Sequence, residues 1–256
     1  MSLPVLIDFD GVIRLGQTPA PGAKEFLKFL YVEKIPSCII SNSTLLSGEG
    51  IKEWLGKKKL PSGMEAMTSV DAALNYVKEN YKRVSVYCSE MIKEKFYEFR
   101  DDENPEAVLI GDNGRKWNFE MMNQIFTKVI NGADLLAMHM NRYWYPDDEE
   151  LVMDAGGFIR AIEYSTGKKA ILMGKPSPVY FQSALSMLGL SKEIEFIMIG
   201  DDLETDIIGA QNCGGKGLLV YTGKTKFTLN NDAKPKPDFE SKNLIEAMEV
   251  IKNLVR

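Results

Sequence analysis

Alternation of short apolar runs with amphipathic helical patterns is the feature that most limits the folds open to this chain. Apolar runs of strand length occur at 5–9 and 37–41, and a helical pattern that Pro21-Gly22 opens lies between them. Strands that alternate with helices predict a parallel sheet, because each parallel connection needs a crossover that a helix can supply. We therefore expect an α/β fold whose functional residues lie at the carboxyl ends of the strands.

The same alternation recurs within the middle of the chain. Three apolar runs of strand length and two helical patterns follow one another there, at 84–88, 91–99, 107–110, 119–130 and 135–140. This βαβαβ order predicts a second α/β domain inserted into the first. We expect a core domain of residues 1–81 and 170–256 and an inserted cap domain of residues 82–169.

Two carboxylates follow the first predicted strand, in the tetrad Asp8-Phe9-Asp10-Gly11. Residues two apart on an extended strand project to the same side, so Asp8 and Asp10 can converge on one small volume. A hard cation such as Mg²⁺ takes oxygen ligands, and would leave one carboxylate as nucleophile and a second to move protons. An acidic turn that caps a strand is the alternative interpretation of the tetrad alone.

Polar and charged side chains also follow three other predicted strands. The first group is a hydroxyl and an amide suited to phosphoryl oxygens, the second is a lysine that would neutralise an anion, and the third is an acidic cluster. In chain order these residues are Ser41 and Asn42, then Lys175, then Asp201, Asp202 and Asp206. A second acidic strand end completes a set of oxygen ligands for a metal ion.

These four segments, in this order, resemble the signature motifs of the haloacid dehalogenase-like (HAD) superfamily, and in particular its phosphatases with an Asp-x-Asp-Gly opening. The sequence GKPSP at 174–178, GDDLETDI at 200–207 and the long insert are similar to the NagD-type, class IIA branch. The resemblance covers essentially the whole chain. It implies a Rossmann-like parallel core with an inserted α/β cap, and hydrolysis of a small phosphorylated metabolite.

The resemblance also implies a catalytic role for the motif residues. Asp8 would be the nucleophile that accepts the phosphoryl group, and Asp10 would protonate the leaving oxygen and then act as the base for water. Ser41 and Asn42 would bind the phosphoryl oxygens. Lys175 would offset charge on the transferring group and keep Asp8 ionised.

A Mg²⁺ ion is the cofactor that the resemblance implies. Asp8, the backbone carbonyl of Asp10 and Asp201 would hold it, with Asp206 and Asp202 outside the ligand set and orienting it. Two alternatives use the same residues or the same fold. One is a phosphotransferase, and the other is a catalytically quiet binding module, since a fold does not guarantee a function.

The cap departs from the pattern of the branch at a stretch that lies over the active site in the family. Many relatives have Asn-Pro-Asp where this chain has Asn141, Arg142, Tyr143 and Trp144, followed by Tyr145-Pro146. Aromatic rings and a guanidinium there are suited to gripping a flat or anionic leaving group. The aromatic run at 143–145 is equally suited to packing inside the cap or to forming a homodimer through it.

Composition limits the partners that we expect. The net charge of −5 gives no basic footprint for nucleic acid, and no apolar stretch approaches the roughly 18 residues that span a bilayer. We therefore expect no nucleic acid partner, no membrane partner and a cytoplasmic location, without a signal sequence before the first strand. Gly223-Lys224-Thr225 is not a phosphate-binding P-loop, because its first glycine would have to replace Leu218.

Overall fold

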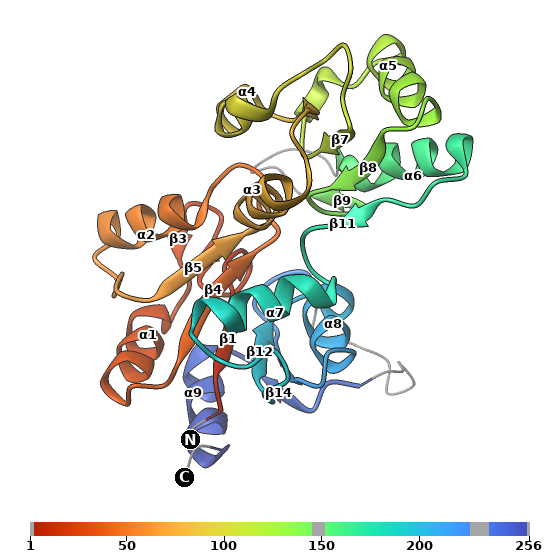
Figure 1. Cartoon of the computed structure of the whole chain (residues 1–256). Coiled ribbons are helices and arrows are strands. Elements are labelled where there is room, and N and C mark those ends of the chain that lie inside the picture. Colours follow the sequence, from red (N-terminus) through yellow and green to blue (C-terminus); the bar gives the residue numbers. More distant parts are fainter. Residues whose placement is uncertain (1–2, 145–151, 226–235, 255–256) are drawn as a thin grey trace. The chain divides into compact units, whose positions relative to one another are not determined.

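The computed structural model describes residues 3–144, 152–225 and 236–254 (Figure 1). The chain forms two compact units, each built around a parallel sheet. The first unit comprises Met1–Ser41, Gly48–Met67 and Lys175–Arg256, and the second comprises Asn42–Ser47 and Thr68–Gly174. The predicted α/β class with a Rossmann-like parallel core is confirmed.

The first unit contains a six-stranded sheet in the order β14-β13-β12-β1-β4-β5. Its strands are β1 (Val5–Asp8), β4 (Ser37–Ser41), β5 (Glu65–Thr68), β12 (Ile197–Gly200), β13 (Lys216–Val220) and β14 (Phe239–Ser241). In parallel register, Ile7 of β1 lies opposite Ile199 of β12 and Ile39 of β4. Along the chain, β4 and β5 are added on one side of β1, and β12, β13 and β14 are then added on the other side. The carboxyl ends of β1 and β12 therefore form the topological switch point at which such sheets bind ligands.

Helices and a small hairpin complete this unit. They are β2 (Arg14–Leu15), β3 (Thr18–Pro19), α1 (Ala23–Val32), α2 (Gly48–Lys57), α7 (Pro178–Met187), the π-helical turn η3 (Leu203–Ile208), α8 (Gly209–Gln211) and α9 (Leu244–Leu254). α1 buries Ala23, Phe26, Leu27 and Leu30, the spacing of one apolar helix face. Consecutive residues of β1 are buried whichever way they point, so both faces of the central sheet are covered.

The second unit contains a four-stranded parallel sheet in the order β11-β8-β7-β6. The strands are β6 (Val84–Tyr87), β7 (Ala107–Ile110), β8 (Asp134–Ala137) and β11 (Ile171–Leu172), with an antiparallel pair β9 (Tyr143–Trp144) and β10 (Val152–Met153). Its helices are α3 (Ser69–Asn80), α4 (Glu90–Lys93), η1 (Glu94–Phe99), η2 (Gly114–Lys116), α5 (Phe119–Ile130) and α6 (Ala155–Thr166). α3 shares one apolar cluster with β6 and β7, and α5 and α6 share another with β7 and β8.

Three details of the second unit differ from the pattern predicted for it. The predicted helix at 91–99 is a short α-helix followed by a 3-10 turn. Helix α6 is additional, and its Gly156 is required because a Cβ there would overlap the backbone of Met140 and Asn141. The apolar cluster around α3 and the pairing of β11 with β8 place both elements in this unit. The boundaries of an inserted domain at 82 and 169 stay a prediction.

No helix in the described part of the chain combines the length and apolar character needed to cross a bilayer.

Candidate active site

Asp8 is the last residue of β1, and it lies in a buried ion pair with Lys175. The Nζ atom of Lys175 is 2.7 Å from Asp8 Oδ1, which also accepts a hydrogen bond from the Phe9 backbone N–H at 2.8 Å. Lys175 Nζ is also 2.6 Å from Asp206 Oδ1. Because the lysine is only 2 % exposed, it bridges two carboxylates inside the protein rather than at the surface.

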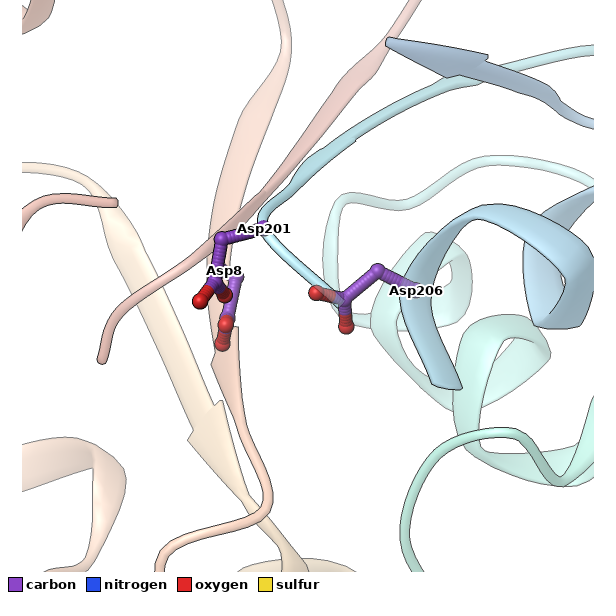
Figure 2. Close-up of side chains that lie close together, drawn as sticks. All are labelled: Asp8, Asp201 and Asp206. Atoms are coloured by element: carbon purple, nitrogen blue, oxygen red, sulfur yellow. The ribbon is translucent and has the colours of Figure 1, made fainter. Parts of the chain in front are cut away.

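Three buried carboxylates converge at the carboxyl end of the sheet. One oxygen atom from each of Asp8, Asp201 and Asp206 lies within 4.8 Å of the others. Asp201 directly follows β12, the neighbour of β1, and Asp206 extends toward them from the helical turn beyond it (Figure 2). The parallel register of β1 and β12 brings the first two together, and the turn after β12 supplies the third.

Among the described residues, the three carboxylates of this cluster carry more charge than the one ammonium group in contact with them. Burial raises the pKa of Asp8 well above its usual value, and the neighbouring carboxylates of Asp206 and Asp201 add to this effect against the opposing influence of Lys175. Burial and Asp206 together raise the pKa of Asp201 to about 6. Burial also raises the pKa of Asp206. Within the part of the chain that the structure describes, Lys175 and Lys224 therefore offset the three carboxylates incompletely, and a divalent cation would relieve the remaining repulsion.

A loop after β13 closes around the Asp201 carboxylate. The backbone N–H of Lys224 donates to Asp201 Oδ2 at 2.6 Å, and the Thr222 hydroxyl donates to the Gly11 carbonyl oxygen at 2.6 Å. A Cβ atom at Gly11 or at Gly223 would overlap the Asp201 carboxyl group. Sequence reasoning missed this contact, whose signal was the pair Thr222-Gly223 one residue beyond the end of the apolar strand β13.

Asp202 faces a different set of partners. Its Oδ1 atom accepts hydrogen bonds from the backbone N–H groups of Glu204 at 3.0 Å and Thr205 at 3.1 Å, and its Oδ2 atom lies 3.0 Å from Lys224 Nζ. The pKa of Asp202 is below its usual value, because Lys224 and the Thr205 N–H outweigh the effect of burial. Asp202 thus caps the helical turn that carries Asp206.

Asp10 and Ser41 meet beside the acidic cluster. Ser41, the last residue of β4, donates from Oγ to Asp10 Oδ2 at 3.2 Å. The hydroxyl of Tyr180 donates to the Ser41 carbonyl oxygen at 2.8 Å and accepts from the Ser41 backbone N–H at 3.1 Å. Arg14 contacts the other oxygen of Asp10, with 2.7 Å between Nε and Oδ1. Neither Tyr180 nor Arg14 belongs to a motif, so the sequence offered no signal for them.

The remaining predicted residues belong to the second unit. Asn42 opens its segment Asn42–Ser47, and the Asn42 carbonyl accepts a hydrogen bond from Ser69 Oγ at 3.2 Å. The predicted specificity residues lie in and before β9, as Asn141, Arg142, Tyr143 and Trp144. Tyr145-Pro146 lies outside the described residues. The roles predicted for these positions stay predictions.

Comparison with known proteins places the chain in a family. A family model described as "Haloacid dehalogenase-like hydrolase" matches residues 5–99, and a second, described as "HAD-hydrolase-like", matches residues 172–247. The haloacid dehalogenase-like hydrolase domain-containing protein 2 of Bos taurus is 33% identical over 248 residues, which cover 96% of this chain and 95% of that protein. The chain belongs to the haloacid dehalogenase-like hydrolase family.

Solved structures agree with this assignment. The structure of 4-nitrophenylphosphatase from Thermotoga maritima is 28% identical and matches with a TM-score of 0.86, covering 98% of this chain and 97% of that one. NagD from E. coli K-12 shares the fold with a TM-score of 0.83 at 23% identity, over 96% of this chain and 98% of that one. The chain described here is a HAD-type phosphatase, as its motifs predicted, and it shares its fold with NagD.

Proposed function

We propose that this HAD phosphatase hydrolyses small phosphorylated metabolites with Mg²⁺ as its cofactor, through a phosphoryl group carried on Asp8. The observation that carries the proposal is the buried pair of Asp8 and Lys175, at 2.7 Å, inside a cluster of three carboxylates. Transfer to a carboxylate splits hydrolysis into two easier steps. Phosphoryl transfer needs mainly alignment and opposite charge, and rigid strand ends supply both.

The chain's own residues divide the chemistry between them. Lys175 and the Phe9 N–H hold Oδ1 of Asp8 and so orient its carboxylate toward an incoming phosphorus. Asp10 gives a proton to the leaving oxygen as the Asp8–phosphorus bond forms, and then takes a proton from the water that releases phosphate. The Ser41 hydroxyl and the Asn42 amide are assigned to the phosphoryl oxygens. Lys175 keeps its proton, because Asp206 and Asp8 raise its pKa despite burial.

The donor set fits a hard divalent cation. Buried carboxylate oxygens that repel one another, with raised pKa values at Asp8 and Asp201, are the ligands that Mg²⁺ prefers. Asp8, the carbonyl of Asp10 and Asp201 would hold the ion, and Asp206 would orient this set through Lys175. When bound, Mg²⁺ supplies positive charge that stabilises the transferring phosphoryl group.

Substrate choice is assigned to the stretch from Asn141 to Trp144 in the second unit. Substitution of Trp144 by alanine separates two uses of this stretch. A higher KM at unchanged molecular mass supports a substrate lid, whereas a change from dimer to monomer supports an interface.

The test of the proposed function is release of p-nitrophenol from its phosphate ester. Turnover should require Mg²⁺, stop with EDTA and be absent from Asp8→Asn protein, in which the shape is kept and the nucleophile is lost. Asp134→Asn, at an exposed position in the second unit, is the matched control and should turn over as the wild type does. Turnover that survives in Asp8→Asn would contradict the assignment of the nucleophile. Product analysis with an added acceptor alcohol separates hydrolysis from transfer.

A further inference from the structure

A tight turn folds Arg14 back alongside Asp10. The backbone N–H of Arg14 donates to the Phe9 carbonyl at 2.8 Å, and the N–H of Gly11 donates to the Arg14 carbonyl at 2.8 Å. The guanidinium of Arg14 then meets Asp10 Oδ1, with 2.7 Å from Nε and a second contact from the terminal nitrogen to the same oxygen. The backbone of the turn thus fixes which residue contacts the Asp10 carboxylate.

Two aromatic rings hold this guanidinium in place. Its central carbon lies 4.7 Å from the ring centre of Phe9 and 6.0 Å from that of Trp54. The two rings contact each other edge to face, with 5.2 Å between their centres, and Phe9 is fully buried. The side chain of Arg14 is 19% exposed. A stacked, mostly buried guanidinium loses little further freedom when it binds a carboxylate, so its position is set in advance.

The two oxygens of Asp10 therefore have different surroundings. Arg14 contacts Oδ1 through Nε and one terminal nitrogen, Nη2. Oδ2 instead accepts a hydrogen bond from Ser41 Oγ, the hydroxyl assigned to the phosphoryl group. Without the guanidinium, the carboxylate of Asp10 could rotate and exchange its oxygens. Proton transfer falls steeply when the donor atom is misplaced, because the reacting atoms must be within hydrogen-bond reach.

We propose that Arg14 is a positioning residue that holds Oδ1 of Asp10, so that Oδ2 is the oxygen that exchanges protons. This inference rests on the proposed function. As the Asp8–phosphorus bond forms and the bond from phosphorus to the leaving oxygen breaks, the proton on Oδ2 moves to that oxygen and a neutral alcohol leaves. In the second step the water oxygen bonds to phosphorus as the Asp8–phosphorus bond breaks, and Oδ2 takes the proton that this water loses. Arg14 acts only through its contacts with Oδ1 and takes no part in the proton exchange.

A series of substituted phenyl phosphates tests this role. Esters of poor leaving groups depend on the proton from Asp10, whereas p-nitrophenolate leaves almost without it. In Arg14→Met protein, kcat/KM for phenyl phosphate should therefore fall at least about tenfold more than kcat/KM for p-nitrophenyl phosphate. Arg14→Lys, which keeps the charge but not the planar stacked group, should lie between. Lys52→Met removes an ion pair with Glu65 elsewhere in the same unit, with 2.9 Å between Nζ and Oε2. This control should leave the ratio of kcat/KM for phenyl phosphate to kcat/KM for p-nitrophenyl phosphate unchanged.

A double substitution separates positioning from general support of the fold. In an Asp10→Asn background no proton remains to be positioned, so adding Arg14→Met should not change the ratio further. A ratio that is unchanged in the single variant, or that changes again in the double variant, overturns the inference alone. If Arg14→Met does not fold, the Arg14→Lys ratio decides in the same way. Absence of turnover by the wild type on every ester overturns the proposed function and this inference with it.

Discussion

Lys175 and Asp8, 167 positions apart in the chain, form a buried ion pair with 2.7 Å between Nζ and Oδ1. The second carboxylate on this lysine, Asp206, is 2.6 Å away and fully buried. The pair thus fastens the end of β1 to the segment before α7 and to the turn after β12. In the proposed function the same ammonium group also serves the chemistry, so stability and turnover should both depend on it.

Substitution of Lys175 by methionine should both abolish turnover and destabilise the fold. Removing one partner of a buried pair leaves uncompensated charge, at a cost of about 3–5 kcal/mol in the free energy of unfolding. Urea unfolding in EDTA measures the cost. Lys52→Met is the matched control, since its pair with Glu65 is partly exposed and should contribute about 1 kcal/mol or less. A loss in Lys175→Met no larger than in the control would contradict the account.

In metal-free protein, Asp201 should make the fold less stable as the pH rises from 4 to 7. Its pKa is raised to about 6, mainly by burial and then by Asp206, so between pH 4 and 6 the folded state holds a proton that the unfolded chain has lost. The stabilising contribution is therefore present at low pH and is lost as the pH rises through 6, by about 2–3 kcal/mol.

Comparison with Asp201→Asn protein isolates this contribution. In EDTA, the unfolding free energy of the wild type minus that of the variant should fall between pH 4 and 7, and Mg²⁺ should restore it at pH 7. A difference that rises with pH would show that Asp201 is stabilised in its ionised form by the protein alone.

Replacement of Tyr180 by phenylalanine should destabilise the end of β4. The buried hydroxyl donates to the Ser41 carbonyl and accepts from its N–H, so its removal should cost about 1–3 kcal/mol. Tyr164→Phe makes the same chemical change at a side chain that is 92% exposed, and should change stability by less than about 0.5 kcal/mol. Equal urea midpoints for the two variants would refute the role given to the hydroxyl.

A methyl group at Gly223 should weaken Mg²⁺ binding. A Cβ there would overlap the Asp201 carboxyl group, so either the loop or this proposed ligand must move. Displacing an outer contact of a metal ligand typically lowers affinity about tenfold or more, which the Mg²⁺ concentration for half-maximal turnover reports. Gly56→Ala in α2 has no atom within 4 Å of its new carbon, and should keep that concentration unchanged while stabilising the helix.

The carboxyl edge of the first sheet could be predicted from the sequence. Asp8, Ser41 and Asp201 each lie at the end of an apolar strand, and the carboxyl ends of parallel strands lie at one edge of a sheet. That these three side chains come close together therefore follows from the alternation of strands and helices alone. The approach of Asp206 and Lys175 to this edge did not follow from alternation, because Asp206 lies in the turn beyond β12 and the strand before Lys175, β11, belongs to the second sheet.

The contacts of Arg14 and Tyr180 could not be predicted in this way. Arg14 contacts Asp10 because a turn reverses the chain, and Tyr180 contacts Ser41 although the two residues are 139 positions apart in the sequence. Both depend on packing of particular side chains, which leaves no periodic signal. Helix α6 escaped prediction for a related reason. The glycines at its start lower helix propensity, but Gly156 is required because a Cβ there would overlap the backbone of Met140 and Asn141.

The most direct test of the central claim is a rapid-quench experiment on Asp10→Asn protein with p-nitrophenyl phosphate and Mg²⁺. This variant keeps the proposed nucleophile, Asp8, but lacks the proposed base for water, so the phosphoryl group should accumulate on the enzyme. We predict a burst of about one p-nitrophenol per chain, with the added phosphoryl mass in the peptide that contains Asp8. Steady turnover without a burst, or the phosphoryl group on a different peptide, would contradict the aspartyl-phosphate mechanism.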